Sequence, residues 1–151
     1  MKISNTASSL AICLTGALLL TGCSPIVSLE AAPLANDPNC AEISVRLPDS
    51  IDAFAKRSTN AQATAAWGDP AAVILRCGLE PVLVSTLPCV TAGDVDWLVD
   101  ETQAPSYRFI SFGRTPATEI IVDSNVVAGV TALETLAAAV QNIEPTKLCT
   151  G

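Results

Sequence analysis

Residues 67–77 read Trp-Gly-Asp-Pro-Ala-Ala-Val-Ile-Leu-Arg-Cys, and this stretch decides the centre of the fold. Gly68-Asp69-Pro70 contains strong turn formers and predicts a reversal of the chain. Ala71–Cys77 follows as a nearly unbroken apolar run with β-branched residues, which is typical of a buried central strand. Arg76 interrupts the run, and a guanidinium in such a strand needs an acidic partner or a path to solvent.

Downstream of this segment, alternating patterns predict three more strands. In Val95–Val99 every second residue is apolar, which indicates a half-buried strand. Tyr107–Phe112 and Ala117–Val122 flank Gly113-Arg114-Thr115-Pro116, a run of turn formers. These two segments are therefore predicted to pair as a hairpin.

Upstream of Trp67, the pattern predicts a strand and then a short helix. Cys40–Leu47 alternates apolar with polar residues, and Pro48 ends it. Asp49 or Ser50 is a suitable N-cap for a helix. The apolar side of this helix would contain Ile51, Phe54 and Ala55.

Near the C-terminus, Thr131-Ala132-Leu133-Glu134 has the pattern of a capping box at a helix start. Apolar residues recur behind it at helical spacing up to Val140, and Pro145 marks the end. The expected element order is β-α-β-β-β-β-α. This order predicts an α+β fold: a small antiparallel or mixed sheet of about five strands, with two helices packed on one face.

The N-terminus has the pattern of an export signal. Lys2 precedes an apolar run, Leu10–Leu20, which is too short for a comfortable membrane span of about 20 residues. Leu20-Thr21-Gly22-Cys23 resembles the lipobox of bacterial lipoproteins. The resemblance implies a signal peptide over residues 1–22 and lipid attachment at Cys23. An ordinary signal peptide with an incidental cysteine is the alternative.

The remaining chain divides into a linker and one domain. Residues 23–39 contain three prolines among small and polar residues, which predicts a lipidated, poorly ordered tether. Residues 40–151 have the length of a single globular α+β domain. Two acyl chains on Cys23 would make a stable membrane anchor, whereas one would be marginal.

The cysteines predict two disulfides in an exported domain. Of the six in the chain, four lie beyond Cys23: Cys40, Cys77, Cys89 and Cys149. An even number in an exported domain indicates disulfide pairing, and three connectivities are possible. We favour Cys77–Cys89, which closes a short loop, and Cys40–Cys149, which joins the ends of the domain.

Composition excludes several functions. Removal of residues 1–22 takes away Lys2 and no acidic residue, so 7 basic against 15 acidic residues leave a net charge of −8. This charge argues against nucleic-acid binding. The chain has no histidine and no Cys-x-x-Cys motif, so we expect no metal site, no cofactor and no Ser-His-Asp triad.

Six residues form a candidate polar cluster, for structure or for binding: Trp67, Asp69, Arg76, Asp96, Trp97 and Arg114. Asp69 or Asp96 can neutralise Arg76, and an arginine can stack on a tryptophan. In the structural interpretation, these groups order the turns. In the functional interpretation, tryptophan stacks a sugar or peptide while arginine holds a carboxylate.

Four motifs together resemble an actinobacterial lipoprotein family known as domain of unknown function 3515. They are Trp67-Gly68-Asp69-Pro70, Ile74-Leu75-Arg76-Cys77-Gly78, Val95-Asp96-Trp97-Leu98 and Gly113-Arg114-Thr115-Pro116, in the family's order. The likeness covers most of Cys40–Cys149. One departure is Thr91-Ala92-Gly93-Asp94, where the family pattern has an Asn-Gly pair before the Val-Asp-Trp segment. The resemblance implies a place in the actinobacterial envelope and no known activity.

These patterns lead to two hypotheses of function. In the first, the protein is a non-enzymatic accessory or binding module on the extracytoplasmic face of the cell membrane. It would be held there by lipid, with an envelope protein or glycan as its partner. In the second, it is a hydrolase of envelope polysaccharide that uses Asp69 and Asp96 as paired carboxylates.

Overall fold

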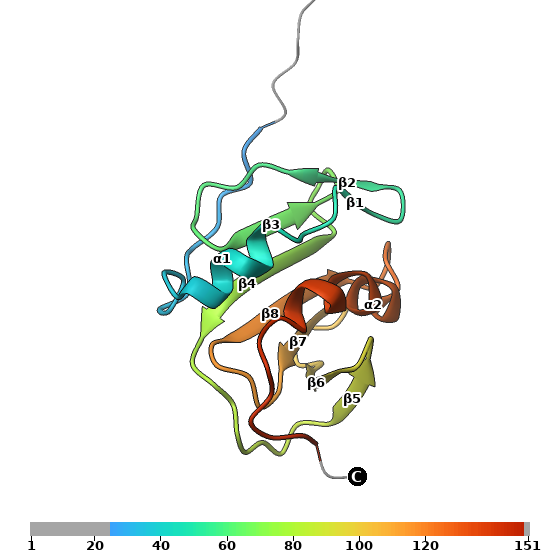
Figure 1. Ribbon diagram of the computed structural model, residues 1–151. Coiled ribbons are helices and arrows are strands. Elements are labelled where there is room, and N and C mark those ends of the chain that lie inside the picture. The colour runs from blue at the N-terminus through green and yellow to red at the C-terminus, as the bar shows by residue number, and fades with distance from the viewer. Residues whose placement is uncertain (1–24, 150–151) are drawn as a thin grey trace, which may run out of the picture.

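The computed structural model describes residues 25–149, so the predicted signal peptide and Cys23 lie outside the described residues. One antiparallel sheet of eight strands carries both helices on the same face (Figure 1). The elements are α1 (Pro38–Ser44), β1 (Ser50–Ile51), β2 (Phe54–Arg57), β3 (Thr64–Trp67), β4 (Val73–Leu79), β5 (Cys89–Ala92), β6 (Val95–Asp100), β7 (Ser106–Ser111), β8 (Ala117–Asp123) and α2 (Gly129–Val140). This confirms the α+β class, with more strands than the expected five or so.

The sheet centre is β4 paired with β8. The strand order is β1-β2-β3-β4-β8-β7-β6-β5, and all neighbours are antiparallel. The predicted strands at β4, β6, β7 and β8 are confirmed. The strands that the pattern missed, β1, β2, β3 and β5, have two to four residues each, too few for a period to be visible.

The prediction of a strand over Cys40–Leu47 is wrong, because the first part of this segment, up to Ser44, belongs to helix α1. Asp37 caps the helix, its Oδ1 accepting the Asn39 N–H at 2.8 Å, and Pro38 is its first residue. Cys40 and Ile43 are three residues apart, so they share the one buried side of the helix. The apparent alternation includes Val45, which is exposed.

The prediction of a helix after Asp49 is also wrong, because β1 and β2 form a hairpin there. Ile51 pairs with Phe54 across a tight turn. Asp52 supports this turn at a φ of 51°, a left-handed conformation that aspartate tolerates better than most residues. The capping box is wrong as well: α2 begins at Gly129, and its N-cap Ala128 has no side-chain hydrogen bond.

The core lies between the sheet and the helices. Alternate residues of the central strands, among them Val73, Leu75, Ile120 and Val122, face the helices and are fully or nearly fully buried. Leu136 lies in the middle of α2 and is buried against them. The opposite, outer face of the sheet carries neither of the two helices.

The segment from Pro25, expected to be part of a poorly ordered tether, packs on the domain. Val27 pairs with Thr59, and Asn60 Oδ1 accepts the Leu29 N–H at 2.7 Å. Leu34 donates its N–H to the Gly78 carbonyl at 2.8 Å. A Cβ on Gly78 would lie 2.4 Å from the Ala35 nitrogen, so only glycine allows this crossing. The folded unit thus begins before Cys40.

The four cysteines beyond Cys23 all form disulfides, as predicted, but the favoured pairing is wrong. Cys40 pairs with Cys77, which joins α1 to β4, and Cys89 pairs with Cys149, which joins β5 to the C-terminal segment. Cys77 and Cys89 are close in sequence only. Their strands are separated in the sheet by β8, β7 and β6, a distance of about 19 Å at about 4.8 Å per strand.

Candidate binding site on the open sheet face

The outer face of the sheet has a covered part and an open part. The covered part is a small apolar cluster, Leu98, Ile110, Phe112 and Ala117, over which Val82, Leu87 and Cys149 pack. Lys147 and Thr146 also cross this part, and Thr146 donates its N–H to the Gly113 carbonyl at 2.7 Å. The open part, here called the open face, consists of Ile74, Arg76, Arg108, Glu119 and Ile121.

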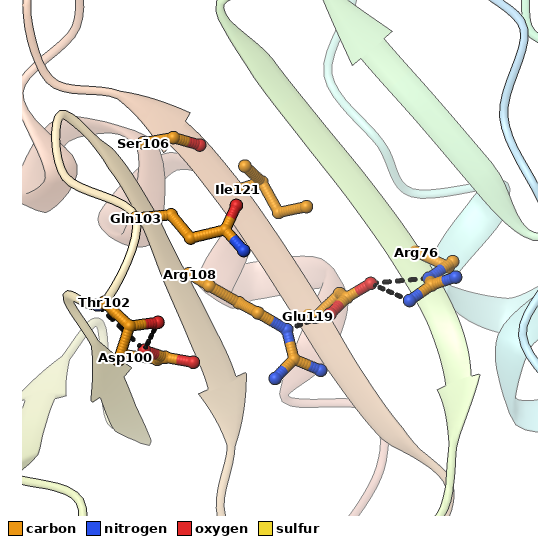
Figure 2. A pocket seen from close by; sticks show the side chains of 8 residues that line it. All are labelled: Arg76, Asp100, Thr102, Gln103, Ser106, Arg108, Glu119 and Ile121. Carbon is orange, nitrogen blue, oxygen red and sulfur yellow. Dashed lines mark hydrogen bonds and ion pairs between the residues drawn. The ribbon is translucent and has the colours of Figure 1, made fainter.

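Glu119 is at the centre of the open face, between two arginines (Figure 2). Its Oε1 accepts from Arg76, whose Nε and Nη2 each lie 2.5 Å away. Its Oε2 accepts from Arg108 Nε. The sheet register accounts for the arrangement, because Arg76 of β4 is directly opposite Glu119 of β8, and Arg108 reaches it from β7.

The three side chains differ in burial. Glu119 is 2% exposed, whereas the side chains of Arg76 and Arg108 are 32% and 36% exposed. Each guanidinium has N–H donors beyond those that bind Glu119, so both can bind a further acceptor. The carboxylate neutralises one of the two positive charges. Arg76, Arg108 and Glu119 together therefore carry a net charge of +1, with donors directed towards solvent.

Two hollows, with volumes of about 260 and 440 Å³, lie beside the charged side chains of the open face. Both are lined by Arg76, Glu119 and Ile121. The smaller is bounded on its far side by Asp100, Thr102, Gln103 and Ser106. The larger is bounded by Ser28, Leu29 and Glu30 of the N-terminal segment. An acidic residue thus lies at each side of the arginines.

Asp100 is held in place by the turn that follows β6. Its Oδ1 accepts from Thr102 Oγ1 at 2.7 Å and from the Thr102 N–H at 3.0 Å. These hydrogen bonds lower the pKa of Asp100 below its ordinary value, and the nearby charge of Arg108 acts in the same direction. Asp100 is therefore a fixed negative group at the rim of the smaller hollow.

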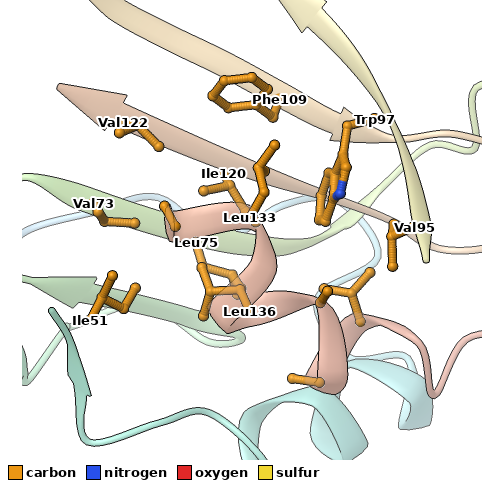
Figure 3. Close-up of a cluster of buried hydrophobic side chains, with 14 of the residues drawn as sticks. Ile51, Val73, Leu75, Val95, Trp97, Phe109, Ile120, Val122, Leu133 and Leu136 are labelled. Carbon is orange, nitrogen blue, oxygen red and sulfur yellow. The ribbon is translucent and has the colours of Figure 1, made fainter. Parts of the chain in front are cut away.

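The structure separates most of the predicted polar cluster. Only Arg76 lies on the open face, and its acidic partner is Glu119, not Asp69 or Asp96. Trp67 and Trp97 are fully buried on the helix side (Figure 3 labels Trp97). Their indole N–H groups donate to the carbonyls of Pro48 and Ala92. Neither tryptophan is available to stack a ligand.

The two carboxylates of the hydrolase hypothesis are far apart. Asp69 precedes β4 and forms an ion pair with Arg57 at 3.0 Å. Asp96 is on β6, which is three strand spacings or about 14 Å from β4 across the sheet. It also lies at the opposite end of the strands from Asp69. Glycosidases hold their two carboxyl groups within about 10 Å. Asp96 instead accepts from Thr91 Oγ1 and from the Cys149 N–H.

Arg114 has a structural place under the C-terminal segment. It is 3% exposed, and its Nη1 donates to the Ile143 carbonyl. Burial lowers the pKa of Arg114 below its ordinary value, while the charges of Glu144 and Asp96 oppose the shift. Its contacts connect the β7–β8 turn to the segment that follows α2.

Sequence reasoning missed Arg108 and Glu119, although a signal was present. Both are charged residues at alternate positions within predicted strands, Tyr107–Phe112 and Ala117–Val122. The predicted hairpin would have placed opposite charges on one face of adjacent strands. Their meeting with Arg76 depended on the strand order, which the sequence patterns did not supply.

The fold and site define a small disulfide-bonded α+β domain with one closed and one partly open sheet face, and the disulfides indicate an extracytoplasmic protein. Residues 8–148 match the family model described as protein of unknown function (DUF3515), so the chain belongs to this family. No curated protein and no solved structure matches the chain. Within residues 25–149, none of the helices has the length and hydropathy of a membrane span.

Proposed function

We propose that this protein is a non-enzymatic binding module of the cell envelope, anchored by lipid at Cys23 to the extracytoplasmic face of the cell membrane. Its open face holds a carboxylate of an envelope peptide or glycan. One observation carries the binding part of the proposal: buried Glu119 orients two partly exposed arginines at the floor of an open depression.

The chemistry of the depression favours a carboxylate ligand over a neutral one. Arginine forks match the planar geometry of a carboxylate, and such charge-assisted hydrogen bonds are stronger than neutral ones. Glu119 fixes the orientation of both guanidinium groups before a ligand binds, which lowers the entropic cost of binding. Asp100 and Glu30 at the sides suit amino or hydroxyl groups of the same ligand.

The non-enzymatic part of the proposal is supported by how the acidic groups are used. Both oxygens of Glu119 already accept hydrogen bonds from arginine. Asp100 accepts from Thr102, and Asp69 and Asp96 have partners elsewhere. These contacts suit groups that position a ligand better than groups that exchange protons with it.

Carboxylate binding to the open face is tested with D-glucuronate as the probe and D-glucose as the uncharged control. We expect glucuronate to shift the arginine Nε–H signals in NMR spectra of the protein, and glucose to leave them unchanged. Arg108→Gln should weaken glucuronate binding about tenfold, the value of one hydrogen bond to a charged group. Arg46→Gln, at an exposed residue just after α1, is the matched control for loss of one positive charge. Equal responses to both sugars, or equal losses in both variants, would contradict the carboxylate site.

The anchor is tested separately by Cys23→Ala in the native host. We expect loss of fatty-acid labelling and release of the protein from the membrane fraction, because the thiol accepts the lipid. Cys13→Ala, within the predicted signal peptide, is the matched control and should retain labelling. Unchanged labelling of Cys23→Ala would contradict the anchor and leave the binding proposal intact.

A further inference from the structure

Strand β5 is at one end of the sheet, and within residues 25–149 its outer edge is unpaired. In this part of the chain it pairs only with β6, and Cys89, Val90 and Thr91 are exposed. The Val99 N–H donates to the Pro88 carbonyl at 2.8 Å. Because antiparallel hydrogen bonds fall on alternate residues, Pro88, Val90 and Ala92 direct their backbone groups to β6. Cys89 and Thr91 direct theirs outward, where no strand of the described chain pairs with them.

An apolar groove lies beside this edge, on the helix face of the sheet. Its volume is about 370 Å³. Strand residues Val90, Val99 and Phe109 line one side, and Val130 and Leu133 of α2 line the other. Figure 3 shows Phe109 and Leu133 among the buried side chains of the core. Val90 is 41% exposed and Val130 is 56% exposed, so apolar surface remains open on both sides of the groove.

We propose that the β5 edge and this groove form a docking site for an extended apolar segment of another envelope protein. The segment adds to the sheet beside β5 as a further strand. This site is separate from the open face, which is on the other side of the sheet, and does not depend on it.

An extended peptide accounts for both features together. Its backbone pairs with the outward N–H and carbonyl groups of Cys89 and Thr91, as in other cases of strand addition. Its side chains alternate between the two faces, so every second one enters the groove. An acyl chain could fill the groove but would leave the strand edge unpaired.

Charge distinguishes between a foreign segment and a second copy of this chain. Glu101 lies in the groove lining, Asp94 is exposed at the end of β5, and the chain has a formal net charge of −7. Two copies would bring these negative charges together. A segment with lysine or arginine flanking its apolar residues complements them.

The experiment measures peptide binding to the full chain by NMR. The probe is a synthetic seven-residue peptide, Lys-Val-Lys-Val-Thr-Val-Lys, with a peptide of the same composition and clustered valines as its control. We expect the alternating peptide to bind at least tenfold more tightly than the clustered one. The shifts should map to the amides of Cys89 and Thr91 and to the methyl groups of Val90 and Val130. Failure of both peptides to bind, or equal binding, overturns the proposal.

Variants separate the strand edge from the groove. Both Thr91→Pro and Thr91→Val lose the threonine hydroxyl, but only Thr91→Pro also loses the outward backbone N–H. We therefore expect peptide binding to weaken tenfold or more in the proline variant only. Val130→Glu should weaken binding to a similar degree, whereas Val45→Glu, at the exposed residue just after α1, should not. Equal binding by the proline and valine variants overturns strand addition.

The other occupants are tested with the same variants. Palmitate is the probe for a lipid. If palmitate binds in the groove, and its binding is weakened by Val130→Glu but unchanged by Thr91→Pro, the groove is a lipid site and the proposal is overturned. Sedimentation tests for a second copy of this chain. Self-association of the wild type that Thr91→Pro abolishes would identify a second copy as the occupant and overturn the proposal.

Discussion

The two faces of the sheet differ in almost every physical respect. The helix face buries alternate apolar residues of the central strands under α1 and α2, with Trp67 and Trp97 fully enclosed. The open face presents Arg76 and Arg108 around Glu119, partly exposed and beside two hollows. The same strands form both faces. The difference indicates that fold stability comes mainly from the helix face. The open face is where we propose that a carboxylate ligand binds.

The strongest test of this division is Leu136→Ala on the helix face. Leu136 is fully buried in the core, so its truncation removes apolar contacts and leaves a cavity. We expect the free energy of unfolding to fall by about 2–5 kcal/mol, measured by denaturant titration with the disulfides intact.

The control for this variant is Val126→Ala, at an exposed valine outside the core. Its loss should stay within about 0.5 kcal/mol. A loss for Leu136→Ala as small as that of the control would show that the helix face does not dominate stability.

A smaller effect is expected from Glu119→Gln on the open face. The change leaves Arg76 and Arg108 close together without a counter-charge, and the amide can accept on one side only. Because both arginines remain in contact with solvent, we expect a loss of about 1–3 kcal/mol, below that of Leu136→Ala. Added salt should reduce the difference from the wild type.

The matched control is Glu42→Gln on α1, which breaks the exposed pair with Arg46 and should cost about 0.5 kcal/mol or less. A loss for Glu119→Gln greater than that for Leu136→Ala would reverse the assignment of the two faces. The arginines would then belong to the stabilising framework.

Periodicity located the long elements because they bury one side over many residues. The predicted bounds are close to the observed ones for the four longest strands and the longer helix, namely β4, β6, β7, β8 and α2. Short segments gave misleading patterns. Cys40–Leu47 alternates like a strand, yet Asp37, Pro38 and the burial of Cys40 and Ile43 make its first part a helix.

The candidate site was predictable only in part. Arg76 was identified from the cost of a charge within an apolar strand, and the need for an acidic partner was correct. The partner itself, Glu119, is 43 residues away in the sequence. It meets Arg76 because β8 turns back from β7 and pairs with β4, a non-local choice of register.

The sequence alone determined the α+β class, the presence of disulfides and the family resemblance, because these depend on composition, local period and motif order. Only the tertiary structure decided which cysteines pair and which charges meet. It also decided that the tryptophans face the core. Such contacts depend on strand order and on which side of the sheet each residue faces, and residues far apart in the chain set both.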